Sequence, residues 1–232
     1  MDYKKYHRDK TYKENESHFK NIFGKRVNIV LNYVKKGKVL DIGASTGAML
    51  DIFKEEGFET WGVEPSKSSS IAEGKGHKII KDYFEKAKLP VNYFEVIVMN
   101  HTLEHLDDSI GILEKIHKLL KRKGILLVDV PNAGGLGARI LKDNWPYRLP
   151  AEHKHQFTKE TLEEVFKKAG FKVVHFESRS GIFEFNNPIQ EVWESLITGK
   201  KRFFTDIINI PYDILVTYLN SGDSMTVVGE KL

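Results

Sequence analysis

Residues 39–47 read Val-Leu-Asp-Ile-Gly-Ala-Ser-Thr-Gly, an apolar run that ends in an aspartate and opens into a loop of small residues. Apolar residues at helical spacing resume at once, at Met49, Leu50 and Phe53. The pattern predicts a buried strand, a tight turn and a helix. Small residues let the backbone approach a ligand closely, and the start of a helix offers unpaired N–H groups to an anion. A plain turn has the same composition, so this stretch alone does not establish a ligand site.

A second predicted strand, residues 58–64, ends in a carboxylate. This residue, Glu64, follows Gly43 by about twenty positions, the separation seen where an acid at the end of a second strand accepts both hydroxyls of a ribose. The two stretches together predict a nucleoside with a free diol, bound at the carboxyl edge of a parallel sheet.

Four stretches, residues 39–47, 62–66, 93–106 and 119–132, together resemble the class I S-adenosylmethionine-dependent methyltransferases, and within them the ubiquinone-biosynthesis type of O-methyltransferase. The resemblance implies an α/β, Rossmann-like methyltransferase fold. Its seven-stranded sheet is mostly parallel, has an antiparallel C-terminal strand and carries helices on both faces. The resemblance also implies S-adenosylmethionine as the methyl donor and S-adenosylhomocysteine as the product.

The glycine-rich loop departs from the family pattern Asp-x-Gly-x-Gly-x-Gly at one point, where Ser45 replaces the middle glycine. Serine is small enough to leave the turn possible, so we interpret the change as tolerated; a decayed site is the alternative. By the resemblance, Asp82 accepts a hydrogen bond from the adenine amino group, with Tyr83 or Phe84 beside the ring; an exposed loop acid is the alternative. The residues predicted to bind the cofactor are Asp41, Gly43, Ala44, Ser45, Gly47, Glu64, Pro65, Asp82, Tyr83, Asn100 and His101.

The chain divides into four predicted parts. Residues 1–36 form an N-terminal arm and helix, 37–180 the cofactor-binding core, 181–222 a helical insertion, and 223–232 the final strand of the core sheet. The insertion is strongly apolar, but Asp206, Pro211 and Asp213 interrupt it, which excludes a membrane span. We expect it to roof the substrate site or to form a subunit contact, so a homodimer through residues 181–222 is one prediction. Within the core, we expect an amphipathic helix that ends at residues 121–124, Lys-Arg-Lys-Gly.

The 232 residues include no cysteine, which excludes disulfides, thiolate metal sites and cysteine nucleophiles. The first residues are polar and lack the apolar core of a signal peptide, so we expect a cytoplasmic enzyme. The net charge of +4 is concentrated in residues 1–38, which hold eleven Lys and Arg against four Asp and Glu. A solvated helix face is the commoner reason for such a bias, and no recognition motif supports nucleic acid as a partner.

Residues 133–157 form a long connection rich in aromatic residues and histidine, the composition of a functional loop. Methyl transfer from a sulfonium requires alignment of donor and acceptor, and a hydroxyl acceptor also benefits from a base. Histidine suits that role near neutral pH, so His153 and His155 are the predicted catalytic residues and His101 is a third candidate. Purely structural histidines are the alternative. The acceptor is expected to be a small molecule, such as a sugar, a lipid-linked glycan or an aromatic hydroxyl, because flat rings stack on each of these.

Other functions stay open at this point. His101, Glu104 and His105 resemble the Glu-x-x-Glu-His set of metal-assisted O-methyltransferases with the first acid replaced. Many related enzymes carry Glu-His here without metal, so no metal is expected. A nicotinamide-dependent oxidoreductase would need glycine at positions 43, 45 and 48, but the last two are Ser45 and Ala48. A non-catalytic cofactor-binding or scaffold protein of the same fold is the other alternative.

Overall fold

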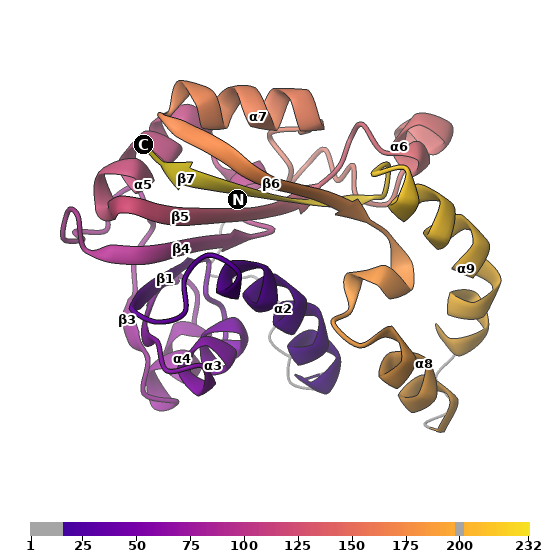
Figure 1. The fold of residues 1–232 in the computed structure, drawn as a ribbon, viewed down its shortest axis with the longest axis horizontal. Helices are drawn as coiled ribbons and strands as arrows, with labels where there is room; N and C mark the ends of the chain where they lie inside the picture. Colours follow the sequence, from indigo (N-terminus) through magenta and orange to yellow (C-terminus); the bar gives the residue numbers. More distant parts are fainter. Residues whose placement is uncertain (1–15, 198–201) are drawn as a thin grey trace.

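Seven strands form one sheet in the order β3-β2-β1-β4-β5-β7-β6 (Figure 1). The computed structural model describes residues 16–197 and 202–232, without the side chains of residues 16–17, 194–195 and 202–207. Residues 1–15 of the predicted arm therefore lie outside the described residues. The strands are β1 (Lys38–Ile42), β2 (Glu59–Val63), β3 (Lys78–Ile80), β4 (Phe94–Asn100), β5 (Leu120–Pro131), β6 (Phe171–Arg179) and β7 (Ser224–Lys231).

All neighbouring strands pair in parallel except β7, which is antiparallel to both β5 and β6. At the centre, Asp41 lies in register with Gly62 of β2 and Val98 of β4. From Val96 to Met99 the central strand β4 is apolar and fully buried, as expected of a strand covered by helices on either side. The predicted mostly parallel, seven-stranded, Rossmann-like methyltransferase fold is confirmed.

Helices cover both faces of the sheet (Figure 1). On one face, α5 (Ser109–Leu119) and α7 (Lys159–Lys168) contribute to a core built around Leu113, Ile116 and Phe166. On the other face, α2 (Glu16–Leu31) and α3 (Ala48–Glu55) contribute to a second core around Val30 and Phe53. The remaining helical segments are α4 (Ser69–Gly74), η2 (Leu103–His105), α6 (Leu136–Leu141), η3 (Lys142–Asn144), η4 (Gly181–Glu184), α8 (Pro188–Ile197) and α9 (Arg202–Tyr218).

The predicted helix end at residues 121–124 is wrong. Helix α5 ends at Leu119, and β5 begins at the next residue. The reason lies in tertiary structure, because Leu120 pairs with Phe94 at the start of β4. Sheet pairing therefore overrides a local sequence that suits a helix terminus.

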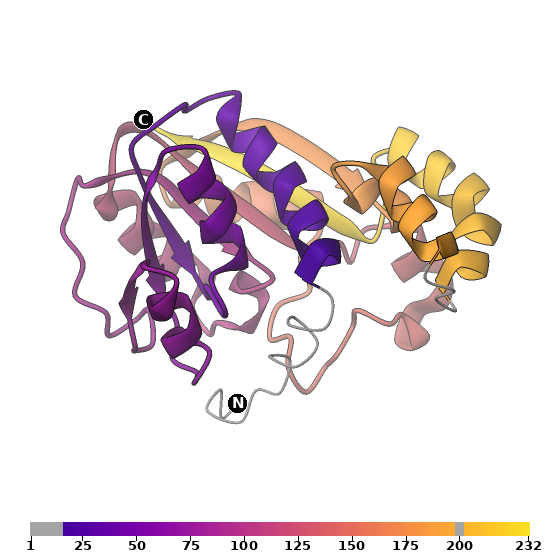
Figure 2. The same ribbon diagram turned by 90° about the horizontal axis from the view of Figure 1, so that it is seen from below.

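Between β6 and β7 the chain leaves the sheet and forms η4, α8 and α9, which stand at one end of the molecule beside α6 (Figures 1 and 2). Within residues 16–197 and 202–232, no helix has both the length and the apolar character needed to cross a membrane.

Candidate active site

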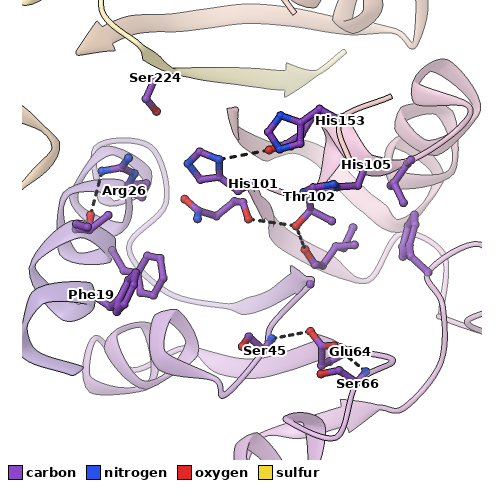
Figure 3. Close-up of a pocket in the computed structure, with 18 of the residues that line it drawn as sticks. Phe19, Arg26, Ser45, Glu64, Ser66, His101, Thr102, His105, His153 and Ser224 are labelled. Carbon is purple, nitrogen blue, oxygen red and sulfur yellow. Dashed lines mark hydrogen bonds and ion pairs between the residues drawn. The ribbon is translucent and has the colours of Figure 1, made fainter. Parts of the chain in front are cut away.

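A cavity of about 550 Å³ opens at the carboxyl ends of β1, β2 and β4 (Figure 3). Its volume is in the range of sites that hold a cofactor together with a small substrate. Residues from every layer of the fold contribute to its wall. They include Phe19, Phe23, Arg26, Gly43, Ser45, Glu64, Pro65, Tyr83, Phe84, Asn100, His101, Glu104, His105, Tyr147, His153, Glu184, Phe185 and Ser224.

The turn after β1 is shaped by three residues with positive φ. Gly43, Ser45 and Gly47 have φ of 86°, 46° and 78°. A Cβ at Gly43 would lie 2.5 Å from Oγ1 of Thr102, so only glycine fits there. Ser45 adopts the left-handed conformation that glycine adopts at little cost, which agrees with the interpretation that the change from glycine is tolerated. The turn thus keeps its backbone N–H groups next to the cavity.

Glu64 is the carboxylate that the turn holds in place. Its Oε2 accepts a hydrogen bond from the Ser45 N–H at 2.8 Å, and its Oε1 accepts one from the Ser66 N–H at the same distance (Figure 3). The side chain is buried in the cavity wall. Each oxygen keeps a second lone pair for a ligand hydroxyl, so this carboxylate fits the ribose role predicted for it.

Asp41 lies at the end of β1 and is buried. Burial, together with the nearby charge of Glu64, raises the pKa of Asp41 to about 7. Asp41 lines a small pocket with Ala44 and Ser45 beside the main cavity, while Gly47 caps α3 and lines neither space.

After β3, Tyr83 and Phe84 contribute to the cavity wall, and Pro65 lies in the wall as well. Asp82 does not line the cavity. Its Oδ1 accepts a hydrogen bond from the Tyr83 N–H at 2.8 Å, so it braces the segment that carries the two rings. Its role toward adenine stays a prediction.

His101 follows β4 and has a positive φ of 49°. Its Nδ1 lies 3.3 Å from Oε1 of Glu104 (Figure 3), and its Nε2 lies 3.6 Å from Oδ1 of Asp129. Burial opposes a charge on this ring, but the two carboxylates outweigh it, and the pKa of His101 is raised. A protonated imidazole is a hydrogen-bond donor and a poor base.

His153 differs from His101 in protonation and in hydrogen bonding. Its Nδ1 lies 2.8 Å from the Tyr147 carbonyl oxygen, which can only accept, so Nδ1 carries the proton and Nε2 carries the lone pair. Burial lowers the pKa of His153, and the charge of Glu104 opposes that effect only in part. This cavity residue is therefore a neutral imidazole near pH 7. His155 is not in the cavity wall: its ring stacks on Phe157, and its Nε2 contacts the Asp107 carbonyl.

Glu104 lies beneath these histidines and is 1% exposed. Apart from the contact of Oε1 with His101 at 3.3 Å, its two carboxylate oxygens have no hydrogen-bond partner among the residues that the structure describes. One ligand atom each from Glu104, His105 and His153 lies within 4.8 Å of the others, close enough to surround a small cation. The absence of a metal stays a prediction.

A buried ionic cluster lies behind Arg26 and Glu184 of the cavity wall, and the sequence did not reveal it. Asp129 of β5 is fully buried; Arg179 donates to it at 2.8 Å, and Arg26 donates to it at 3.3 Å. Arg26 also donates to Oε2 of Glu184 in η4 at 2.5 Å. Burial alone would raise the pKa of Asp129, but the two guanidinium groups hold it well below its ordinary value. Two features of the sequence could have indicated this cluster: an arginine, Arg26, on the apolar face of the first helix, and a lone acid, Asp129, inside an apolar strand.

The comparisons with known proteins agree with this geometry. A family model described as a methyltransferase domain matches residues 18–176. A ubiquinone biosynthesis O-methyltransferase from Rhodopseudomonas palustris is 24% identical over 174 residues, which cover 68% of this chain and 65% of that protein. The C-methyltransferase NovU from Streptomyces niveus is 25% identical over 142 residues, which cover 59% of this chain and 33% of that protein. Each alignment therefore spans less than two thirds of the relative's own length.

Among solved structures, a Thermotoga maritima protein described as a SAM-dependent methyltransferase and possible histamine N-methyltransferase has a TM-score of 0.63. It is 20% identical, and the alignment covers 97% of this chain and 98% of that one. At this identity the likeness shows the fold alone. The family model covers well over half of the chain and therefore shows which family the chain belongs to. This protein belongs to the class I S-adenosylmethionine-dependent methyltransferases, and S-adenosylmethionine is its cofactor.

Proposed function

We propose that this enzyme methylates a hydroxyl oxygen of a small-molecule acceptor and that His153 is the base. The observation that carries the proposal is the state of His153 in the cavity wall. Its Nδ1 proton is committed to the Tyr147 carbonyl, and its pKa is lowered by burial. Nε2 is therefore available to take the proton of an acceptor hydroxyl as the new bond forms. His155 lies outside the wall, so the proposal assigns the base to His153 and uses His155 as the comparison.

The other residues of the site position and shield the reactants. When bound, S-adenosylmethionine supplies an electrophilic methyl group on a sulfonium. Glu64 and the backbone of the turn after β1 fit its ribose and amino-acid part, and Tyr83 and Phe84 fit its base. The raised pKa of His101 favours its protonated form, so the proposal assigns it the role of hydrogen-bond donor to the acceptor, not of the base. Exclusion of water by the aromatic wall favours alignment of the two reactants.

The composition of the acceptor side favours a sugar, a lipid-linked glycan or an aromatic hydroxyl. Phe19, Tyr147 and Phe185 provide flat apolar surfaces, and Glu104 provides two oxygens that can accept hydrogen bonds from acceptor hydroxyls. The relative from Rhodopseudomonas palustris is named as an O-methyltransferase, which supports oxygen as the acceptor atom. The name of the Streptomyces niveus relative supports a second candidate, an acidic carbon, because a neutral histidine can remove a proton from carbon as well.

The test uses labelled S-adenosylmethionine with pools of candidate acceptors, followed by NMR of the labelled product to identify the methylated atom. We expect His153→Ala to lower the turnover of the acceptor found by roughly a hundredfold or more. His155→Ala should stay within a factor of about three, since that ring lies outside the wall. Calorimetry with S-adenosylhomocysteine should give equal affinities for both variants. Undiminished turnover by the His153 variant would remove this residue from the mechanism.

A further inference from the structure

The cavity wall that the proposed function places beside the adenine ring belongs to the connection between β3 and β4, which has neither helix nor strand. Tyr83 and Phe84 of this connection line the cavity. Just after them, the N–H groups of Lys86 and Ala87 both donate to the Tyr83 carbonyl oxygen at 3.0 Å and close one tight turn. We call residues 83–87 the adenine turn. A single turn has few hydrogen bonds to offset the ordering of its residues, so it needs support from elsewhere in the fold.

Lys115 reaches the adenine turn from α5. Its Nζ donates hydrogen bonds to the carbonyl oxygens of Phe84, Glu85 and Ala87, at 2.5, 3.1 and 3.0 Å. Nζ also lies over the ring of Phe84, 4.6 Å from the ring centroid. An ammonium group has three N–H donors and no acceptor, so this group spends all of its donors on one turn. The turn is thereby tied to α5 by one side chain from a distant part of the sequence.

The place of Lys115 on α5 explains how a lysine can act there. Ile112 and Ile116 of the same helix are buried in the core, whereas Lys115 is half-buried. The aliphatic stem of a lysine in such a position can lie along apolar surface while its charged end reaches polar groups. Burial lowers the pKa of Lys115, and the nearby acids Glu85 and Asp82 oppose that effect. The three carbonyl oxygens and the two acids together compensate for the water that the ammonium group has lost.

We propose that Lys115 is a positioning residue of the cofactor site and holds the adenine turn in the conformation that receives the adenine ring. The proposal rests on the placement of that ring beside Tyr83 and Phe84 in the proposed function. With Lys115 in place, the wall is formed before the cofactor arrives. Without it, only a fraction of the free protein has a formed wall, and the apparent affinity falls by that fraction. A lysine that merely stabilised the fold would change the free energy of unfolding and leave the affinity as it is.

Lys115→Met tests the proposal, because methionine keeps an unbranched apolar stem and removes all three donors. In calorimetry with S-adenosylhomocysteine, we expect its affinity to be roughly threefold to thirtyfold below that of the unchanged protein. Lys115→Arg, which keeps the charge and several donors, should recover part of this loss. The matched control is Lys118→Met, which changes an exposed lysine on the same helix. Its affinity should equal that of the unchanged protein.

Hydrogen exchange followed by mass spectrometry shows where Lys115→Met acts. In the free variant, peptides that contain residues 83–87 should exchange severalfold faster than in the unchanged protein, because the N–H groups that close the turn open more often. Peptides from β1 and β4 should exchange as before. Saturation with S-adenosylhomocysteine should restore the protection of the turn, since the ligand selects its formed conformation. Urea denaturation of each variant establishes that it is folded under the conditions of the binding experiment.

Equal affinities of Lys115→Met and Lys118→Met would overturn the proposal, and so would faster exchange spread over the whole protein. Lys115→Gln, which keeps two donors without the charge, takes the place of the methionine variant if that variant does not fold. Tyr83→Leu tests the placement of the ring separately: it should weaken binding roughly tenfold, and an unchanged affinity would remove adenine from this wall and the proposal with it. None of these measurements uses an acceptor, so an error in the role of His153 would not affect them.

Discussion

The two halves of the cavity are built on different principles. The cofactor half consists of the turn after β1 and Glu64, and its key contacts are backbone N–H groups held by one nearby carboxylate. The acceptor half consists of residues from 133–157, η4 and α2, with Asp129 of β5 behind them. Its key groups are ionisable side chains from distant segments, since Arg26 and Glu184 are 158 residues apart. A backbone cradle can bind the same cofactor while its side chains vary. A side-chain wall can change its specificity without disturbing that cradle.

The acceptor half should be the costlier one to damage. Asp129→Asn removes the negative charge that Arg26 and Arg179 share in the protein interior and leaves them one acceptor oxygen. We therefore expect the free energy of unfolding to fall by about 3–5 kcal/mol. Urea denaturation measures this free energy of unfolding. Asp107→Asn, at an exposed acid, should change stability by less than about 0.5 kcal/mol. A loss for Asp129→Asn as small as that of this control would mean that the cluster does not hold the wall together.

In the cofactor half, Asp41 should make stability depend on pH. Its pKa rises from its ordinary value near 4 to about 7 on folding, so the folded state binds more protons between those values. The free energy of unfolding therefore falls as pH rises from 4 to 7, by about 3 kcal/mol from this group. Asp41→Asn has no such carboxyl, and its stability curve from pH 4 to 8 should lack this decline. Parallel curves for the two proteins would show that Asp41 titrates normally.

Glu64 should affect ligand binding more than folding. An amide in place of the carboxylate accepts only one of the two backbone hydrogen bonds and offers less to the ribose, so affinity for S-adenosylhomocysteine should fall roughly tenfold to a hundredfold in Glu64→Gln. Calorimetry measures the affinity. Glu59→Gln, at the start of β2 and at the far end of that strand from the cavity, should bind as the unchanged protein does. Equal affinities in all three proteins would separate the carboxylate from the cofactor.

The smallest expected effect concerns Ser45. Glycine removes the strain of a side chain at φ 46°, so Ser45→Gly should gain up to about 1 kcal/mol of stability and keep its affinity for S-adenosylhomocysteine. Thermal unfolding and calorimetry measure the two quantities. Ser68→Gly, at φ −60°, has no such strain to relieve and should lose stability. A gain in affinity of tenfold or more for Ser45→Gly would show that the serine impairs the site.

The difference between the cofactor half and the acceptor half also explains how much of the site could be predicted from the sequence. The turn after β1 and Glu64 lie within one strand–turn–helix–strand segment, so spacing alone placed them. Asp129, Arg26 and Glu184 meet only through the folded sheet, and no local pattern pairs them. His153 was found from its residue type, but its separation from His155 depends on how residues 145–157 coil against Glu104. The prediction of a helix end at residues 121–124 was wrong for the same reason, since Leu120 pairs with β4 in the folded sheet.

The position of β7 has a consequence for how the chain is made. This strand fills the gap between β5 and β6, yet it follows β6 by more than forty residues. Until residues 224–231 have left the ribosome, β6 has no partner strand in the sheet, and the helices α8 and α9 have no completed sheet to pack against. We therefore expect the insertion of β7 between β5 and β6, a non-local event, to be a late and slow step of folding that leaves apolar surface exposed until it occurs.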